Sequence, residues 1–248
     1  MDKVALITGG GRGIGAATAK HLADLGYSIG VNYKQNSATA EALVTQLQAQ
    51  GCRALAIQAD VSIESEVVAM FNYLDEHLGK ITALVNNAGI LQPQMKVIDM
   101  SAERINRILT NNVTSYFLCC REAIKRMALS RGGYGGAIVN VSSVASRIGG
   151  AGEYVDYAAS KGAIDTLTKG LSLEVAADSI RVNSVRPGFI HTEMHADGGE
   201  PDRVKRLSPQ IPMQRGGEPE EVAAAIAWLL SDEASYVTGT FVDLAGGR

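Results

Sequence analysis

The chain has 248 residues, of which 46% are hydrophobic and 20% are charged, and its formal net charge is −3. This length and composition fit one large domain or two small ones. The basic residues are scattered along the sequence, which argues against binding to nucleic acid or to an anionic membrane surface. The three cysteines form no CxxC motif, so the sequence indicates neither a disulfide framework nor a zinc knuckle.

The N-terminal stretch MDKVALITGG has too short an apolar run for a signal peptide, because it passes directly into glycines. No apolar stretch approaches the ~18 residues of a membrane span. We therefore expect a cytoplasmic protein. In a reducing compartment, the adjacent Cys119 and Cys120 fit packing within a buried helix better than a redox role.

Short β-branched runs alternate with longer amphipathic runs along the whole chain. Strands are predicted at 3–8, 27–33, 54–58, 83–87, 137–143, 180–187 and 240–245, and helices at 14–25, 36–50, 63–78, 101–129, 154–177 and 218–231. This alternation predicts an α/β fold in a single Rossmann-type doubly wound domain, residues 1–248, with a parallel sheet covered by helices on both faces. The one long irregular segment, 188–216, is expected to be a lid or a binding loop.

The first predicted strand leads into a glycine-rich turn, ITGGGRGIGAAT, at the start of the first predicted helix. Such a turn lets the backbone approach a pyrophosphate, and the helix N-terminus offers free N–H groups to it. A phosphate-binding P-loop would need Gly-Lys-Ser/Thr at its end, where this chain has Ala16 and Ala17. The turn therefore predicts a dinucleotide site formed by Gly9, Gly11, Arg12, Gly13, Ile14 and Gly15.

The second predicted strand indicates which dinucleotide binds. In NAD-binding units an acidic residue ~20 residues beyond the glycines holds the ribose 2′-hydroxyl, yet residues 26–40 contain no Asp or Glu. Asn32, Tyr33 and Lys34 end the strand and, with Arg12, could accommodate a 2′-phosphate. We therefore expect NADP(H) rather than NAD(H), and a solvated surface lysine is the alternative interpretation of Lys34.

The stretch EYVDYAASK contains two tyrosines and a lysine on a predicted helix. Tyr157 and Lys161 are four residues apart and share a face, whereas Tyr154 lies ~10 Å from Lys161 along the axis. A neighbouring ammonium, helped by the positive nicotinamide ring of an oxidised cofactor, would lower the pKa of Tyr157 below the free value of ~10, which suits an acid–base catalyst. Ser143 ends a predicted strand and is placed to bond a developing oxyanion, while Ser142 points to the opposite face. Tyr154 is expected to line the substrate pocket.

The segment RPGFIHTEMH follows the sixth predicted strand. His191 and His195 are four residues apart, but the metalloprotease order His-Glu-x-x-His is absent because Glu193 lies midway between them. No metal site is therefore expected, and a substrate lid is the better interpretation.

Together these motifs resemble the short-chain dehydrogenase/reductase family. They occur in family order and span essentially the whole chain: TGGGRGIG (8–15), DV (60–61), NNAG (86–89), NNVTSYF (111–117), VSS ending at Ser143, YAASK (157–161) and RPGFIHT (186–192). The resemblance implies about seven parallel strands, nicotinamide-dependent chemistry on alcohols and ketones, and a homotetramer.

The resemblance also assigns roles to individual positions. It implies that the catalytic residues are Asn112, Ser143, Tyr157 and Lys161, with Asn112 anchoring a water near the lysine as a proton relay. It implies that Lys161 also bonds the nicotinamide ribose and that Thr192 bonds the carboxamide. The other implied cofactor contacts are Asp60, Val61, Asn87, Ala88, Gly89, Tyr157, Pro187, Gly188 and Ile190.

The leading prediction is an oxidoreductase that transfers a hydride between NADP(H) and a small carbonyl or secondary alcohol. A β-ketoacyl-carrier-protein reductase and a sugar or polyol dehydrogenase both remain open. Asp178 and Ser179 stand where the former would expose an arginine, although Arg131 remains available. The alternative is an inactive regulatory protein of the same fold, against which the intact set of serine, tyrosine and lysine argues. An extended epimerase would carry a C-terminal substrate domain, for which we expect no room.

Overall fold

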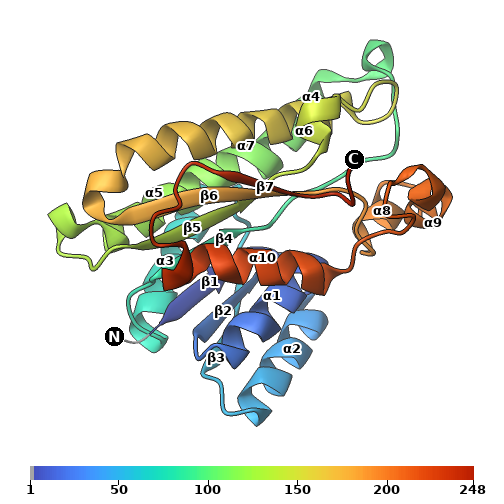
Figure 1. Ribbon diagram of the computed structural model, residues 1–248. Helices are drawn as coiled ribbons and strands as arrows, with labels where there is room; N and C mark the ends of the chain where they lie inside the picture. Colours follow the sequence, from blue (N-terminus) through green and yellow to red (C-terminus); the bar gives the residue numbers. More distant parts are fainter. Residues whose placement is uncertain (1–2) are drawn as a thin grey trace.

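The computed structural model describes residues 3–248 (Figure 1). Within these residues seven strands form one parallel sheet in the order β3-β2-β1-β4-β5-β6-β7. The strands are β1 (Val4–Ile7), β2 (Ser28–Tyr33), β3 (Ala54–Gln58), β4 (Ala83–Asn86), β5 (Gly136–Val141), β6 (Ile180–Pro187) and β7 (Phe241–Leu244). All seven lie where the sequence predicts strands, which confirms the predicted parallel sheet.

Ten α-helices accompany the sheet in the described part of the chain. They are α1 (Gly13–Asp24), α2 (Ser37–Ala49), α3 (Glu64–His77), α4 (Ala102–Leu109), α5 (Ser115–Met127), α6 (Ala145–Ile148), α7 (Val155–Glu174), α8 (Met194–Asp197), α9 (Arg203–Leu207) and α10 (Pro219–Leu230). Local sequence fixes several of their starts. In α10, for example, Pro219 occupies the first turn and Glu218 forms a capping box with Glu221.

The helices cover both faces of the sheet, so the protein has three layers (Figure 1). One core lies between the sheet and α1, α2 and α10, and the other lies between the sheet and α3, α5 and α7. Successive residues of a strand point to opposite faces, so Ala5 and Ile7 enter the first core while Val4 and Leu6 enter the second. Cys119 and Cys120 are buried in the second core, as predicted.

Two predicted segments differ from the structure. The predicted helix 101–129 is divided into α4 and α5 by a π-helical turn at Thr110–Thr114, where one extra residue widens the helix. The predicted irregular segment 188–216 contains the short helices α8 and α9, which lie beyond one end of the sheet (Figure 1). Among the described helices, none is both long and apolar enough to cross a membrane.

Candidate active site

The strand order reverses next to β1, which pairs with β2 on one side and with β4 on the other. In open parallel sheets ligands bind at such a switch point, beyond the carboxyl ends of the strands. A cleft of about 480 Å³ lies there. Most of the predicted cofactor-binding residues line this cleft, namely Gly9, Gly11, Arg12, Gly13, Ile14, Asn32, Tyr33, Lys34, Asp60, Val61, Asn87, Ala88 and Gly89.

Side chains at the ends of β1 and β4 hold the glycine turn in place. The Thr8 hydroxyl accepts hydrogen bonds from the backbone N–H groups of Asn87 and Ala88, each at 3.0 Å. The Asn87 amide donates to the carbonyls of Thr8 and Gly9, also at 3.0 Å. A Cβ at Gly15 would lie only 2.7 Å from the Asn87 side chain, so Gly15 permits this packing and does not itself line the cleft.

The N-terminus of α1 faces the cleft without a side-chain cap. Arg12 occupies the capping position with extended backbone, and its side chain makes no capping hydrogen bond. Free N–H groups and a partial positive charge at a helix N-terminus suit a pyrophosphate. The Arg12 guanidinium instead forms an ion pair with Asp197 at the end of α8. This pair joins the glycine turn to the segment 188–216, which contains α8 and α9.

Lys34, directly after β2, pairs with a carboxylate at the cleft. Lys34 Nζ lies 2.6 Å from Asp60 Oδ2, and its side chain is 51% exposed. Lys34 also lines the cleft, so it is not simply a solvated surface lysine. Burial alone would raise the pKa of Asp60, but hydrogen bonds from Lys34 and Ser62 hold it below its usual value. Lys34 is therefore available to a ligand that can displace one carboxylate.

Asn32 does not offer its side chain to a ligand, contrary to the sequence prediction. It is 2% exposed, and its amide accepts from the Gly9 N–H at 3.2 Å. The same amide donates to the carbonyls of Ile57 at 3.3 Å and Ala59 at 3.0 Å. Asn32 thus fixes the glycine turn against β2 and β3, and its amide is fully used in doing so.

A second cavity, of about 410 Å³, adjoins the first and shares Ile14, Asn87, Thr192 and Met194 with it. The remaining predicted residues, except Gly15 and Asn112, line this second cavity: Ser143, Tyr154, Tyr157, Lys161, Pro187, Gly188, Ile190 and Thr192. The structure therefore brings the predicted serine, tyrosine and lysine together beside the glycine turn.

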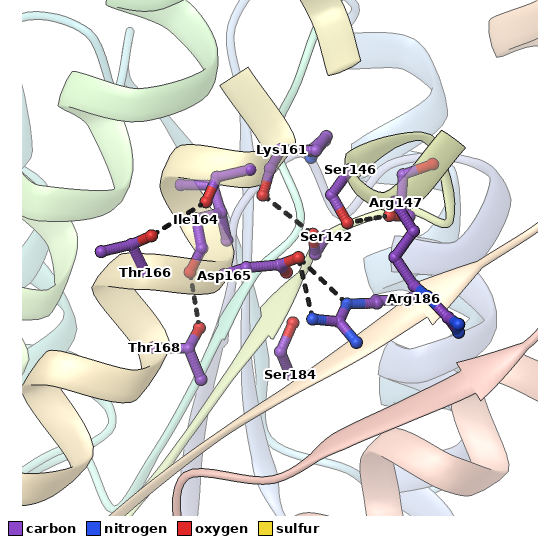
Figure 2. A network of polar contacts seen from close by, with 12 residues as sticks. Ser142, Ser146, Arg147, Lys161, Ile164, Asp165, Thr166, Thr168, Ser184 and Arg186 are labelled. Carbon is purple, nitrogen blue, oxygen red and sulfur yellow. Dashed lines mark hydrogen bonds and ion pairs between the residues drawn. The ribbon is translucent and has the colours of Figure 1, made fainter. Parts of the chain in front are cut away.

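Helix α7 is fastened to the sheet at the position of its reactive side chains (Figure 2). The Ser142 hydroxyl donates to the Lys161 carbonyl at 3.2 Å, which agrees with the structural role predicted for this serine. One turn further along, Asp165 forms an ion pair with Arg186 of β6, with Nη2 and Oδ2 2.9 Å apart. These contacts fix the height and rotation of α7 above the ends of β5 and β6.

Lys161 is almost completely buried. Its ammonium donates to the Val141 carbonyl at 2.7 Å and to the Tyr116 hydroxyl at 3.4 Å. Burial lowers the pKa of Lys161 from 10.5 to about 7, although the charge of Asp165 acts in the opposite direction. The amine lies 5.6 Å from the centre of the Tyr157 ring, so the two side chains are neighbours, as their spacing predicts.

The predicted effect on Tyr157 is wrong in direction. Burial raises the pKa of Tyr157 to about 12, and a hydrogen bond with Ser143 only partly offsets this. The prediction counted the lysine charge and the positive ring of an oxidised nicotinamide, whereas withdrawal from water disfavours tyrosinate and ammonium together. At neutral pH the site therefore holds Tyr157 in its protonated form.

Asn112 lies in the π-helical turn and is completely buried. Its Oδ1 accepts from the Ile90 N–H at 2.8 Å, and its Nδ2 donates to the Ile90 carbonyl at 3.0 Å and to Ser160 Oγ at 3.2 Å. A Cβ at Gly89 would lie 3.5 Å from Asn112 Oδ1 and 3.7 Å from Lys161 Nζ, so the asparagine and the lysine both approach this glycine. Its side chain thus shapes the wall beside Lys161, and the relay role stays a prediction.

Tyr154 contacts the segment 188–216 at two points. This tyrosine precedes α7, is 6% exposed, and its hydroxyl donates to the Gly198 carbonyl at 3.2 Å. The guanidinium of Arg203 in α9 stacks on its ring at 4.9 Å. His191 and His195 have separate partners, since His191 faces Glu218 at 3.9 Å while His195 bonds a backbone carbonyl at 3.1 Å.

The sequence reasoning missed several residues of the second cavity, including Leu91, Phe189, Arg203, Arg206, Leu207 and Arg248. They come from loops, from α9 and from the last residue of the chain. Phe189 lies inside the motif RPGFIHT, and Arg203, Arg206 and Leu207 lie in the predicted lid segment 188–216, but no pattern marks these positions individually. Only the tertiary fold brings them together.

Comparisons with known proteins agree with this geometry. The family model described as "Enoyl-(Acyl carrier protein) reductase", one of the models of short-chain dehydrogenases/reductases, matches residues 9–248. The chain belongs to the short-chain dehydrogenase/reductase family. Within this family it is 66% identical over 245 residues to an uncharacterised oxidoreductase of Escherichia coli K12, YgfF, with 99% of each chain covered. The chain is therefore an oxidoreductase.

More distant members of the family have names that describe different substrates. A 3-oxoacyl-[acyl-carrier-protein] reductase of Staphylococcus aureus, FabG, is 37% identical over 247 residues, which cover 100% of this chain and 98% of that protein. Glucose 1-dehydrogenase 2 of Bacillus subtilis is 36% identical and is covered to 94%. The crystal structure of a dehydrogenase/reductase from Sinorhizobium meliloti 1021 matches 99% of the chain with a TM-score of 0.91 at 31% identity.

Proposed function

We propose that this protein is an NADP(H)-dependent oxidoreductase that interconverts a small carbonyl compound and its secondary alcohol, with Tyr157 as the acid–base group. One observation carries the proposal: Ser143, Tyr157 and Lys161 line a single cavity that adjoins the cleft at the glycine turn. A substrate carbonyl in this cavity can therefore lie between the three polar groups and a dinucleotide bound in the cleft.

The residues of the cleft fit a nicotinamide dinucleotide. The uncapped N-terminus of α1 would bind the pyrophosphate, and the neighbouring cavity would take the nicotinamide end against Pro187, Gly188 and Thr192. When bound, the nicotinamide donates or accepts the hydride. Every other step is carried out by side chains of the protein.

Three side chains share the remaining chemistry. In reduction, the carbonyl carbon gains the hydride while Tyr157 gives its hydroxyl proton to the carbonyl oxygen, and oxidation runs the same transfer in reverse. The Ser143 hydroxyl hydrogen-bonds this oxygen as negative charge develops on it. Lys161 lies beside the Tyr157 ring. In its ammonium form it is placed to favour the tyrosinate that reduction leaves behind, before solvent returns its proton.

Two cations at the cleft support NADP(H) over NAD(H). Arg12 and Lys34 each pair with one carboxylate, Asp197 and Asp60 respectively. A phosphate monoester carries about −1.5 to −2 charges and three acceptor oxygens, so it competes well against a single carboxylate for either cation. No acidic side chain is present in β2 or directly after it.

An initial-rate screen tests the proposal. Ketones, aldehydes, sugars and acyl thioesters are offered with NADPH and with NADH, and the reduced-nicotinamide absorbance is followed. With the best substrate, Tyr157→Phe should lower kcat by roughly 10²–10⁴, the usual contribution of general acid–base catalysis. Binding of NADPH should persist, because the glycine turn is unchanged.

Tyr134, whose side chain is 62% exposed, provides the matched control. Tyr134→Phe removes the same hydroxyl far from both cavities and should leave kcat within about twofold of wild type. If Tyr157→Phe keeps a tenth or more of the wild-type kcat, Tyr157 is not the acid–base group and the proposed mechanism is refuted.

A further inference from the structure

Three guanidinium groups line the second cavity on the side formed by α9 and the last residue of the chain. They belong to Arg203, Arg206 and Arg248, and among the described residues Glu153 is the one carboxylate side chain that lines the same cavity. The rest of the wall is largely apolar, with Leu91, Val144, Ile148, Phe189, Met194 and Leu207. The partners of these three guanidinium groups therefore decide whether the wall can bind an anion.

Two carboxylates balance two of the three arginines. Arg203 is 7% exposed and forms ion pairs with both Glu153 and Glu200, the latter with Nη1 and Oε2 2.5 Å apart. Arg206 donates from Nε to the other oxygen of Glu200 at 2.6 Å. Each of these guanidiniums thus has a carboxylate partner, and Arg203 in particular is held in a fixed, buried position.

Arg248 is exposed and, among the described residues, has no carboxylate side chain as a partner. Its guanidinium lies 5.0 Å from the ring centre of Phe189, and Arg203 approaches the same ring at 5.6 Å. Within residues 3–248 no carboxylate side chain forms an ion pair with Arg248, although sixteen ion pairs occur elsewhere. A guanidinium stacked on a ring still has its N–H edge free for a bidentate bond to an anion.

We propose that the substrate is an oxo acid, a carbonyl compound that also carries a carboxylate, and that Arg248 binds this carboxylate while the carbonyl lies at Tyr157. A single guanidinium edge is matched by the two oxygens of one carboxylate, whereas a phosphate monoester carries about two charges and would need a second free cation. The apolar wall suits the carbon chain between the two groups. This inference rests on the proposed function, because it concerns the substrate of the same site.

The test compares acids with their uncharged esters. NADPH oxidation is measured with 3-oxobutanoate, 4-oxopentanoate, 5-oxohexanoate and 6-oxoheptanoate, and with the methyl ester of each. At one chain length or more, kcat/KM should be roughly 10- to 100-fold higher for the acid, the range of a hydrogen bond between charged groups. In Arg248→Gln the ratio of acid to ester should fall to about 1, and Arg248→Lys should keep part of it.

Arg107→Gln is the matched control, because Arg107 is exposed on α4 and does not line the cavity. It removes the same charge and should keep the preference for the acid. The inference is overturned if no acid exceeds its ester, or if the preference survives in Arg248→Gln.

Failure of the proposed function itself would look different. If neither acids nor esters are reduced, calorimetric titration with the same four oxo acids decides the inference separately. Binding to the wild type that is lost in Arg248→Gln supports the anion site. Equal binding to both proteins, or binding to neither, overturns it.

Discussion

Replacing Lys161 with methionine should stabilise the fold while it destroys turnover. Lys161 is 2% exposed, and burial lowers its pKa from 10.5 to about 7. A lowered pKa means that the ammonium is less stable in the folded chain than in the unfolded chain, so this lysine opposes folding wherever the unfolded chain carries the charge. Methionine has a similar length and no charge. The Val141 carbonyl would keep the Tyr116 hydroxyl as a donor, at 3.0 Å.

The pKa values set the size and the pH range of the effect. A shift from 10.5 to about 7 corresponds to about 3.5 pH units, and at ~1.36 kcal/mol per unit its upper limit is ~5 kcal/mol. Allowing for relaxation around the charge, we expect the variant to gain about 1–3 kcal/mol at pH 6. Between about pH 7 and 10.5 the unfolded chain binds more protons than the folded chain, so wild-type stability rises with pH. The advantage of the variant should therefore shrink across this range.

Urea unfolding at pH 6, 8 and 9.5, followed by circular dichroism at one protein concentration, measures the difference. Lys169 lies on the same helix but is exposed, and Lys169→Met should change stability by less than about 0.5 kcal/mol at every pH. The reasoning is refuted if Lys161→Met is less stable than wild type at pH 6, or if its advantage does not change with pH. Steady-state assays should show that the variant loses turnover and binds NADPH more weakly.

The other predictions concern the lid, the cofactor and the assembly. Tyr154→Phe removes the hydrogen bond to Gly198 and should raise KM more than it lowers kcat; a kcat loss as large as that of Tyr157→Phe would contradict it. Arg12→Ala should weaken NADPH binding by about 1–2 kcal/mol and leave NADH binding nearly unchanged, whereas Asp197→Asn frees the guanidinium and should strengthen NADPH binding by up to about fivefold. Calorimetric titration checks both, and equal effects on NADH would oppose a 2′-phosphate site. Light scattering at micromolar concentration should give a homotetramer, and a monomer would disprove this.

Much of the fold follows from local sequence because buried parallel strands are short, apolar and bounded by turns. The predicted strand 180–187 agrees with β6 at Ile180–Pro187. The π-helical turn was not predicted, since it depends on hydrogen bonds between Asn112 and Ile90, which lie 22 residues apart in the sequence. The helical periodicity of 101–129 continues across the turn, so the amphipathic pattern could not mark it.

In the candidate site, too, local sequence predicts some residues and not others. The glycine turn, Ser143, Tyr157 and Lys161 belong to motifs with fixed spacing, and the structure brings them together. The wall that contains Arg248 has no such motif, because residues from separate loops meet there only in the folded chain. Spacing along one helix predicted the proximity of Tyr157 and Lys161, but their pKa values depend on how completely the surrounding elements exclude water.

That exclusion of water acts on both groups in the direction of the uncharged form. It raises the pKa of Tyr157 to about 12 and lowers the pKa of Lys161 to about 7, so near pH 8 the tyrosine is protonated and most of the lysine is neutral. A protonated tyrosine can donate to a carbonyl oxygen at once, whereas alcohol oxidation must first remove that proton. Oxidation should therefore rise with pH, while reduction should fall as Lys161 loses its proton near pH 7. The surroundings that make Lys161 costly for folding thus favour carbonyl reduction near neutral pH.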